Sequence, residues 1–180
     1  MVLPPHGGSE KGVFIWAEGQ QESGGNYRAV NPGSGALGRW QVMPANLPGW
    51  AAHCRMPAAS PAYFLSHPAY QNRMIDCVLG GYYARYGPYG AAAMWYSGQP
   101  DWHATYGNPP VYQYVADVIS IMRSGHAKPI PGIGGLGPAA PRPSARKEDY
   151  SDRVIHTARK HLHTGRAFNE GAIALRRLRG

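Results

Sequence analysis

The chain is poor in residue types on which whole classes of protein depend. It has two cysteines among 180 residues, Cys54 and Cys77, which is too few for a structural zinc site with several thiolate ligands. Two arrangements stay open for them, one disulfide or two buried free thiols. No stretch is long and apolar enough to predict a membrane-spanning helix. We therefore expect no metal, no cofactor and no transmembrane segment.

Acidic residues are also scarce, and charge is unevenly distributed. The chain has 10 Asp and Glu against 18 Lys and Arg, a net charge of +8. Up to Gly125 there are seven basic residues against six acidic ones, and after it eleven against four. The basic character therefore belongs to the C-terminal segment, where it suits nucleic acid or another acidic partner.

Sustained alternation of β-branched residues, which would indicate a sheet, is missing between residues 11 and 125. Helical signals take its place, because apolar residues recur at helical spacing between Gly and Pro punctuation. We expect helices over residues 11–23, 44–55, 60–66, 70–86, 90–96 and 110–124. The sequence therefore predicts a mainly α-helical domain over residues 11–125.

Proline and glycine mark the edges of this domain. Residues 1–10 are predicted to be a flexible leader, and they lack the features of a signal peptide. Residues 126–145 have the Pro- and Gly-rich composition of a linker. Residues 146–180 combine basic residues with apolar ones at helical spacing, which predicts a basic amphipathic helical tail. The chain is either complete or one module of a longer protein.

One carboxyl group is placed for acid chemistry. Glu22 ends an apolar helical segment just before Gly24 and Gly25, which can adopt the left-handed conformation that terminates a helix. The free carbonyls of a last helical turn carry partial negative charge, and partial burial acts in the same direction, so the pKa of Glu22 is expected to rise. A Glu protonated near neutral pH is what a general acid needs. A solvated Glu at a helix end is the alternative.

The residues that follow Glu22 favour a general acid over a solvated Glu at a helix end. Glu22-Ser23 precedes the run Gly35-Ala36-Leu37-Gly38-Arg39-Trp40-Gln41-Val42-Met43-Pro44. These segments resemble the lytic transglycosylase and goose-type lysozyme family. The form Trp95-Tyr96-Ser97-Gly98, with the Tyr-rich helical segment before it, most resembles the cell-wall-degrading modules of phages of actinobacteria. The resemblance covers residues 11–125. It implies a lysozyme-like α+β fold with a small irregular β element at the substrate cleft, and cleavage of the β-1,4 bond between N-acetylmuramic acid and N-acetylglucosamine by Glu22.

The resemblance also implies substrate-binding residues. Ser34 matches a serine that orients the substrate or the catalytic Glu, and a turn residue is the equally weighted alternative. Gln41 matches a glutamine that bonds a sugar N-acetyl group or the nearby backbone. Met43 belongs to the run that lines the cleft. Aromatic faces pack against sugar rings, and four tryptophans are candidates for that role: Trp40, Trp50, Trp95 and Trp102.

Two tyrosines complete the implied site. Tyr96 lies in a segment similar to the family's Ala-x-x-Tyr-Asn-x-Gly, which places a catalytic tyrosine near the Glu. Ser97 stands where the family has Asn, and the spacing to Gly98 is one residue shorter. Tyr114 resembles a tyrosine on the last core helix whose hydroxyl reaches the Glu.

The reaction type stays open at this point. A lytic transglycosylase needs one carboxyl group and releases 1,6-anhydro products. An inverting hydrolase needs a second carboxylate about 6.5–9.5 Å away to activate water, and Glu18 and Asp101 are candidates. Without a signal peptide, such an enzyme is expected to reach the cell wall through lysis, through a holin or in a phage particle. A non-enzymatic virion protein is the rival interpretation; it accounts for the basic tail but not for Glu22.

Overall fold

The computed structural model describes residues 10–133 of the chain, and this part is mainly helical. The predicted helical tail and most of the predicted leader lie outside the described residues. The elements are α1 (Glu10–Ser23), a 3-10 turn η1 (Pro44–Asn46), α2 (Leu47–His53), α3 (Pro61–Ser66), α4 (Pro68–Ser97) and α5 (Val111–Arg123). None of these helices combines the length and apolar character needed to span a bilayer.

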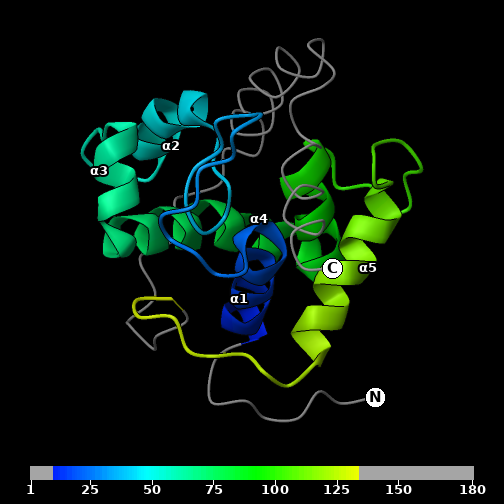
Figure 1. Cartoon of the computed structure of the whole chain (residues 1–180). Coiled ribbons are helices and arrows are strands. Elements are labelled where there is room, and N and C mark those ends of the chain that lie inside the picture. Colours follow the sequence, from blue (N-terminus) through cyan, green and yellow to red (C-terminus); the bar gives the residue numbers. More distant parts are fainter. Residues whose placement is uncertain (1–9, 134–180) are drawn as a thin grey trace.

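Three helices, α1, α4 and α5, pack against one another and form the core (Figure 1). The residues of α1 from Val13 to Gly19 are all buried. In α5 the buried residues recur at helical spacing, which is the amphipathic pattern predicted from the sequence. Each fully buried aliphatic or aromatic side chain stabilises the fold by about 1.5–3 kcal/mol. The core therefore holds α1, and with it Glu22, between two other helices.

The long element α4 consists of two helices with a break at Gly87. This residue has φ 66° and ψ −178°, which is not helical, and Pro88 follows it. A residue before proline is disfavoured in the helical region, and glycine adopts positive φ at little cost. The predicted end of one helix at Gly87 and the start of a second, Ala-rich helix shortly after it are confirmed.

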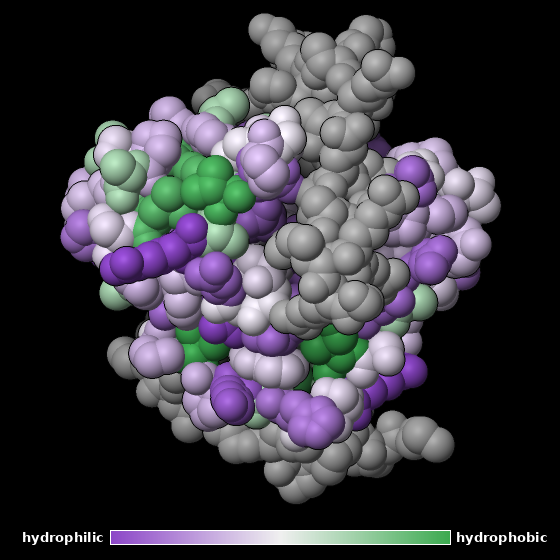
Figure 2. Space-filling model, viewed as in Figure 1, coloured by the Kyte–Doolittle hydropathy of each residue, from purple (hydrophilic) through white to green (hydrophobic). Residues whose placement is uncertain are grey.

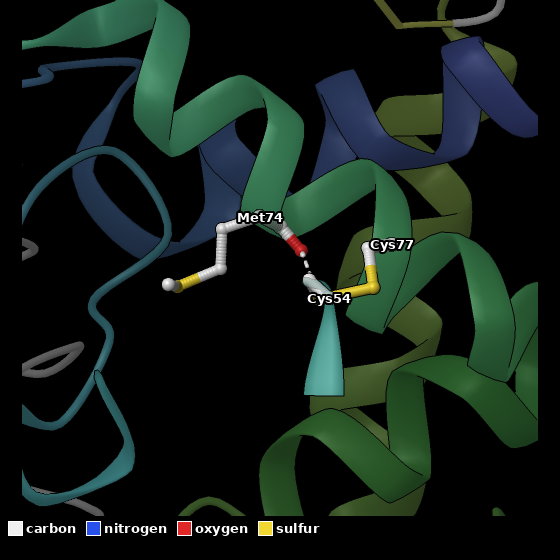
Figure 3. Close-up of a disulfide and its surroundings, with 3 residues drawn as sticks. All are labelled: Cys54, Met74 and Cys77. Carbon is white, nitrogen blue, oxygen red and sulfur yellow. Dashed lines mark hydrogen bonds between the residues drawn. A yellow bond between two sulfur atoms is a disulfide. The ribbon is translucent and has the colours of Figure 1, made fainter. Parts of the chain in front are cut away.

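A disulfide joins the end of α2 to α4. Cys54 and Cys77 are bonded across a sequence separation of 23 (Figure 3). Of the two arrangements that the sequence left open, the structure has the disulfide. In the chain-entropy account, closing a loop of this size stabilises the fold by roughly 3 kcal/mol. The bond fixes α2 and the loop before it to the helical core.

A loop of about twenty residues connects α1 to η1, and it contains the motif run. The sequence predicted a small irregular β element here; among the described residues there is no strand, and the loop has two isolated bridges, Val30 with Leu37 and Leu37 with Val42. Gln71 of α4, 0% exposed, holds the loop: its side chain accepts from Arg39 N–H and donates to the carbonyls of Tyr27 and Phe64.

The motif glycine Gly38 is required by this contact. A Cβ atom at Gly38 would collide with Gln71 Oε1, and the residue has φ 70°. Both the positive φ and the close approach exclude a larger side chain. Glycine at this position of the run therefore lets the loop lie directly on α4.

Part of the predicted linker packs on the folded core. Residues 126–133 lie within it, yet Ile130 and Ile133 are buried in the core, and Asn72 Nδ2 donates to the carbonyl of Pro131. Pro and Gly prevent regular secondary structure here, as predicted, but they do not prevent irregular chain from burying its isoleucines. The folded unit therefore extends to at least Ile133 rather than ending at Gly125.

Polar groups dominate the visible surface, with a few apolar patches. Figure 2 shows the largest patch where the loop between α1 and α2 meets α2 and α3. Exposed large hydrophobic residues among those described are Val30, Tyr63, Trp102, Tyr106 and Tyr112. Four of these five residues are aromatic, and exposed aromatic faces can pack against sugar rings.

Candidate active site

Glu22 lies in the last turn of α1, as predicted. Gly24 and Gly25 follow with φ 66° and 86°, and their N–H groups bond to the carbonyls of Gln20 and Gly19. This is the left-handed helix end that the two glycines predicted. The neighbouring Ser23 donates its hydroxyl to the carbonyl of Arg39 at 2.7 Å. The Glu-Ser pair therefore joins the end of α1 to the motif loop.

Tyr114 connects two carboxyl groups of α1. Its hydroxyl oxygen lies 2.6 Å from Glu22 Oε1 and 2.7 Å from Glu18 Oε2. Glu18 is one helical turn before Glu22, so both side chains lie on the same face of α1, towards α5. Tyr114 and Glu18 are both 0% exposed, whereas Glu22 is partly exposed. Of the two carboxyl groups, Glu22 is the one that a substrate can reach.

The number of available protons indicates how Tyr114, Glu18 and Glu22, which we call the Glu18–Tyr114–Glu22 trio, donate hydrogen bonds to one another. A tyrosine hydroxyl has one hydrogen to donate, yet two carboxyl oxygens lie within bonding distance of it. One carboxyl group must therefore hold its own proton and donate it to the phenol oxygen. Glu18 meets that condition, because it is fully buried and its Oε1 has no hydrogen-bond partner, which disfavours a charge there. Tyr114 is then free to donate to Glu22.

Burial and this shared hydrogen bond set the pKa values. Burial raises the pKa of Glu22 from 4.5 to about 7, against the opposing effect of hydrogen bonds from Tyr114 and Trp95. Burial, reinforced by the charge of Glu22, raises the pKa of Glu18 well above its usual range. The raised pKa and the unpartnered, buried Oε1 favour the neutral form of Glu18, and near neutral pH Glu22 is poised between its two protonation states. That is the condition for a residue that donates and later accepts a proton.

Two aromatic residues from the Ala-rich half of α4 complete the surroundings of Glu22. Trp95 is partly exposed and bonds Glu22. Tyr96 stacks on Tyr114 with ring centroids 4.3 Å apart, and its hydroxyl donates to the carbonyl of Pro109 at 2.7 Å. Burial and the nearby Glu22 raise the pKa of Tyr96 to about 12. Tyr96 thus lies near Glu22, as the resemblance implied, and its ring packs against the ring of Tyr114.

The three predicted substrate-binding residues of the motif loop make local contacts. Ser34 Oγ accepts from the N–H of Ala36, which is the turn role weighed as its alternative. Gln41 has φ 52° and donates its side-chain amide to the carbonyl of Gly38. Met43 is partly buried and immediately precedes η1. The hydrogen bonds of Ser34 and Gln41 within residues 10–133 do not reach Glu22, and their role towards substrate stays a prediction.

The four tryptophans divide into different roles. Trp40 is 0% exposed and donates its indole N–H to the carbonyl of Ile15, so it is a core residue and not a sugar platform. Trp50 is partly buried against Trp95, with ring centroids 5.5 Å apart. Trp102 is 39% exposed and lies against Tyr89. Trp50, Trp95 and Trp102 therefore stay candidates for contact with sugar rings.

Sequence reasoning did not assign Glu18 to the site, although it considered the residue as a possible second carboxylate. The i, i+4 spacing of Glu18 and Glu22 was the available signal, since it places both on one helical face. Only the position of Tyr114 shows that they share a hydroxyl group. No metal role is supported: within residues 10–133 the one group of three possible ligands is His53, Cys54 and Cys77, and both sulfurs belong to the disulfide.

No model of a known protein family, no curated protein and no solved structure matches the chain. What points to a function is the geometry of Glu22 and its neighbours, together with the resemblance of the motif residues.

Replacing Glu22 is expected to stabilise the protein at alkaline pH. A carboxyl group whose pKa is raised by folding favours the folded state below its unfolded pKa, near 4.5, and this advantage is lost as pH rises through the folded pKa of about 7. Glu22→Gln does not titrate, so it should match the wild type at pH 4 and exceed its unfolding free energy by roughly 3 kcal/mol at pH 8. Urea unfolding at both pH values tests this. An equal difference at both would contradict the raised pKa.

Proposed function

We propose that the chain is a peptidoglycan-cleaving enzyme of lysozyme-like fold that acts as a lytic transglycosylase, with Glu22 as its general acid and base. The observation that carries the proposal is one partly exposed carboxyl group, with a pKa of about 7, held by Tyr114 next to a buried carboxyl group. The Glu-Ser and Gly-Ala-x-Gly-x-x-Gln-x-Met-Pro resemblance supports the substrate class.

In the first step, Glu22 donates its proton to the glycosidic oxygen. The bond from C1 of N-acetylmuramic acid to that oxygen breaks, and N-acetylglucosamine leaves with a 4-hydroxyl group. Glu22 becomes a carboxylate in a largely buried site. The hydrogen bonds from Tyr114 and Trp95 stabilise this charged form, which is why they lower the pKa of Glu22.

In the second step, the Glu22 carboxylate takes the proton of the muramic 6-hydroxyl group. The 6-oxygen bonds to C1 and closes a 1,6-anhydro ring, and Glu22 is again protonated. No water is consumed. A group that must donate and accept within one turnover works best with a pKa near the working pH, and the pKa of about 7 fits that need.

The position of Glu18 favours this reaction over inverting hydrolysis. An inverting hydrolase needs a second carboxylate that holds a water molecule on the far face of the sugar. Glu18 is 0% exposed and bonded to Tyr114, so it cannot hold water on the substrate side. Asp101 is exposed, and its Oδ1 accepts from the N–H of His103. If the reaction proves to be hydrolysis, Asp101 is the candidate for the carboxylate that activates water.

Mass spectrometry of digested muropeptides tests the reaction type. We expect fragments ending in 1,6-anhydro-N-acetylmuramic acid, each 18 mass units (roughly one water) below the reducing form. Digestion in ¹⁸O water is the matched control, because a transglycosylase product takes up no label at C1. Labelled reducing ends would show hydrolysis and would overturn the transglycosylase assignment. If no soluble fragments form at all, the proposed peptidoglycan-cleaving activity is wrong.

A further inference from the structure

A pocket lies at the end of α1, lined by residues of α1, the motif loop and residues 128–131. Its volume is about 440 Å³, and its walls include Trp16, Gln20, Tyr27, Arg39, Lys128 and Ile130. Gln20 is two residues from both Glu18 and Glu22, roughly half a helical turn away. The pocket and the Glu18–Tyr114–Glu22 trio therefore face different sides of α1.

Arg39 gives this pocket its chemical character. The residue is 8% exposed, and its Nε and Nη2 are buried without a hydrogen-bond partner. No Asp or Glu within residues 10–133 forms an ion pair with it; the ion pair found there joins Lys11 and Asp76. The guanidinium carbon lies 5.3 Å from the ring centroids of Tyr27 and Trp40. Cation–π contact offsets part of the cost of a buried charge, but it supplies no acceptor for the N–H groups.

A second cation stands at the same pocket. Lys128 is exposed, and the neighbouring Ile130 is buried. Lys128 belongs to the segment that the sequence assigned to a linker, and this segment packs on the core so that Lys128 lines the same pocket as Arg39. Two positive groups thus line one pocket whose other walls include Trp16 and proline rings. A ligand with one anionic group and a small apolar body fits both features.

The end of α1 limits how much negative charge the pocket can accept. The N–H groups of Gly24 and Gly25, which line the pocket, are already bonded to carbonyls of α1. They are not free to cradle a phosphate, and the C-terminal end of a helix carries partial negative charge. A planar, singly charged carboxylate suits one guanidinium and one ammonium group better than a phosphate dianion does.

We propose that this pocket binds a carboxylate group, carried by a small organic acid or by the free C-terminus of a short peptide. Arg39 is the main partner, Lys128 adds a second charge at the pocket, and Trp16 with Ile130 contacts the apolar body. This site is distinct from the proposed catalytic site. Binding at the pocket can be tested without any assumption about the proposed enzymatic activity.

Matched acid and amide probes test the proposal on the full chain. N-acetylalanine and N-acetylalanine amide differ in the carboxylate alone; acetate and a carboxyl-terminated N-acetyl dipeptide separate the two carboxylate sources, and inorganic phosphate serves as the competing anion. Binding is followed by tryptophan fluorescence and calorimetry up to about 10 mM, a range that detects millimolar dissociation constants. We expect saturable binding of the acids and none of the amide.

Variants locate the binding. Lys128→Ala removes an exposed side chain and should weaken acid binding about three- to fivefold. Arg39→Gln should weaken it at least tenfold. Arg73→Ala, an exposed cation outside the pocket, should change nothing. If Arg39→Gln does not fold, as judged by circular dichroism, Lys128→Ala and the acid–amide pair still decide.

Three results would overturn the site. They are equal binding of acid and amide, absence of acid binding over the whole range, and acid binding that Lys128→Ala leaves unchanged. Binding of phosphate alone would overturn the assignment to a carboxylate. If acetate binds as tightly as the dipeptide, the ligand is a small acid, and if the dipeptide is clearly preferred, it is a peptide terminus.

Discussion

Glu22→Gln should lower the rate of peptidoglycan cleavage by roughly 10²–10⁴-fold, the usual contribution of a general acid or base. The glutamine amide keeps the shape of the side chain and can still accept the hydrogen bond from Tyr114. It cannot donate a proton to the glycosidic oxygen or take one from the 6-hydroxyl group. Clearing of purified cell walls, together with counts of soluble muropeptides, measures the loss.

Two further substitutions in α1 show whether the loss of activity is specific to Glu22. Glu10→Gln changes a carboxyl group at the other end of α1 and should leave the rate unchanged. Glu18→Gln replaces a group that we infer to be neutral, so its amide should preserve most of the activity. Cleavage by Glu22→Gln at near the wild-type rate would refute the role of Glu22, and a loss in Glu18→Gln as large as that in Glu22→Gln would mean that Glu18 is charged during the reaction.

Tyr114→Phe should lower the maximal rate by about 10²-fold, the typical effect of removing one preorganised donor. The substitution removes the hydroxyl group that stabilises the Glu22 carboxylate after its first proton transfer. The same hydrogen bond lowers the pKa of Glu22, so its loss raises that pKa above about 7. Because the first step needs protonated Glu22, the alkaline limb of the pH–rate profile should move to higher pH.

The pH profile separates this role from a merely structural one. A loss of packing would lower the rate without moving the alkaline limb. Tyr112→Phe is the matched control, because Tyr112 is on the same helix and 50% exposed, and both its rate and its profile should equal those of the wild type. A Tyr114→Phe variant with an unchanged limb, or one moved to lower pH, would contradict the assigned hydrogen bond.

Much of the fold could be read from local sequence signals. The double glycine after Glu22 and the break at Gly87 each specify a backbone conformation through their own chemistry, and the structure has both. The apolar stripe of α5 likewise specified which face is buried. These features depend on neighbouring residues, which is why they needed no knowledge of the tertiary structure.

The extent of the folded unit was harder to predict. The Pro- and Gly-rich composition from residue 126 onward indicated a linker, and composition predicts regular structure rather than packing. Ile130 and Ile133 nevertheless belong to the buried core, and Asn72 of α4 donates a hydrogen bond to the carbonyl of Pro131 between them. The same packing places Lys128 and Arg39 on the walls of one pocket, and no sequence pattern links those two residues.

The sequence alone determined the candidate acid, because Glu22 stands before two glycines in a motif of characteristic spacing. Only the tertiary structure decided how that acid works. Tyr114 is ninety-two positions away from Glu22 in the chain, and its hydroxyl reaches both Glu18 and Glu22 because α5 packs against α1. The protonation of a carboxyl group depends on how deeply it is buried and on which donors surround it, and both are properties of packing rather than of local sequence.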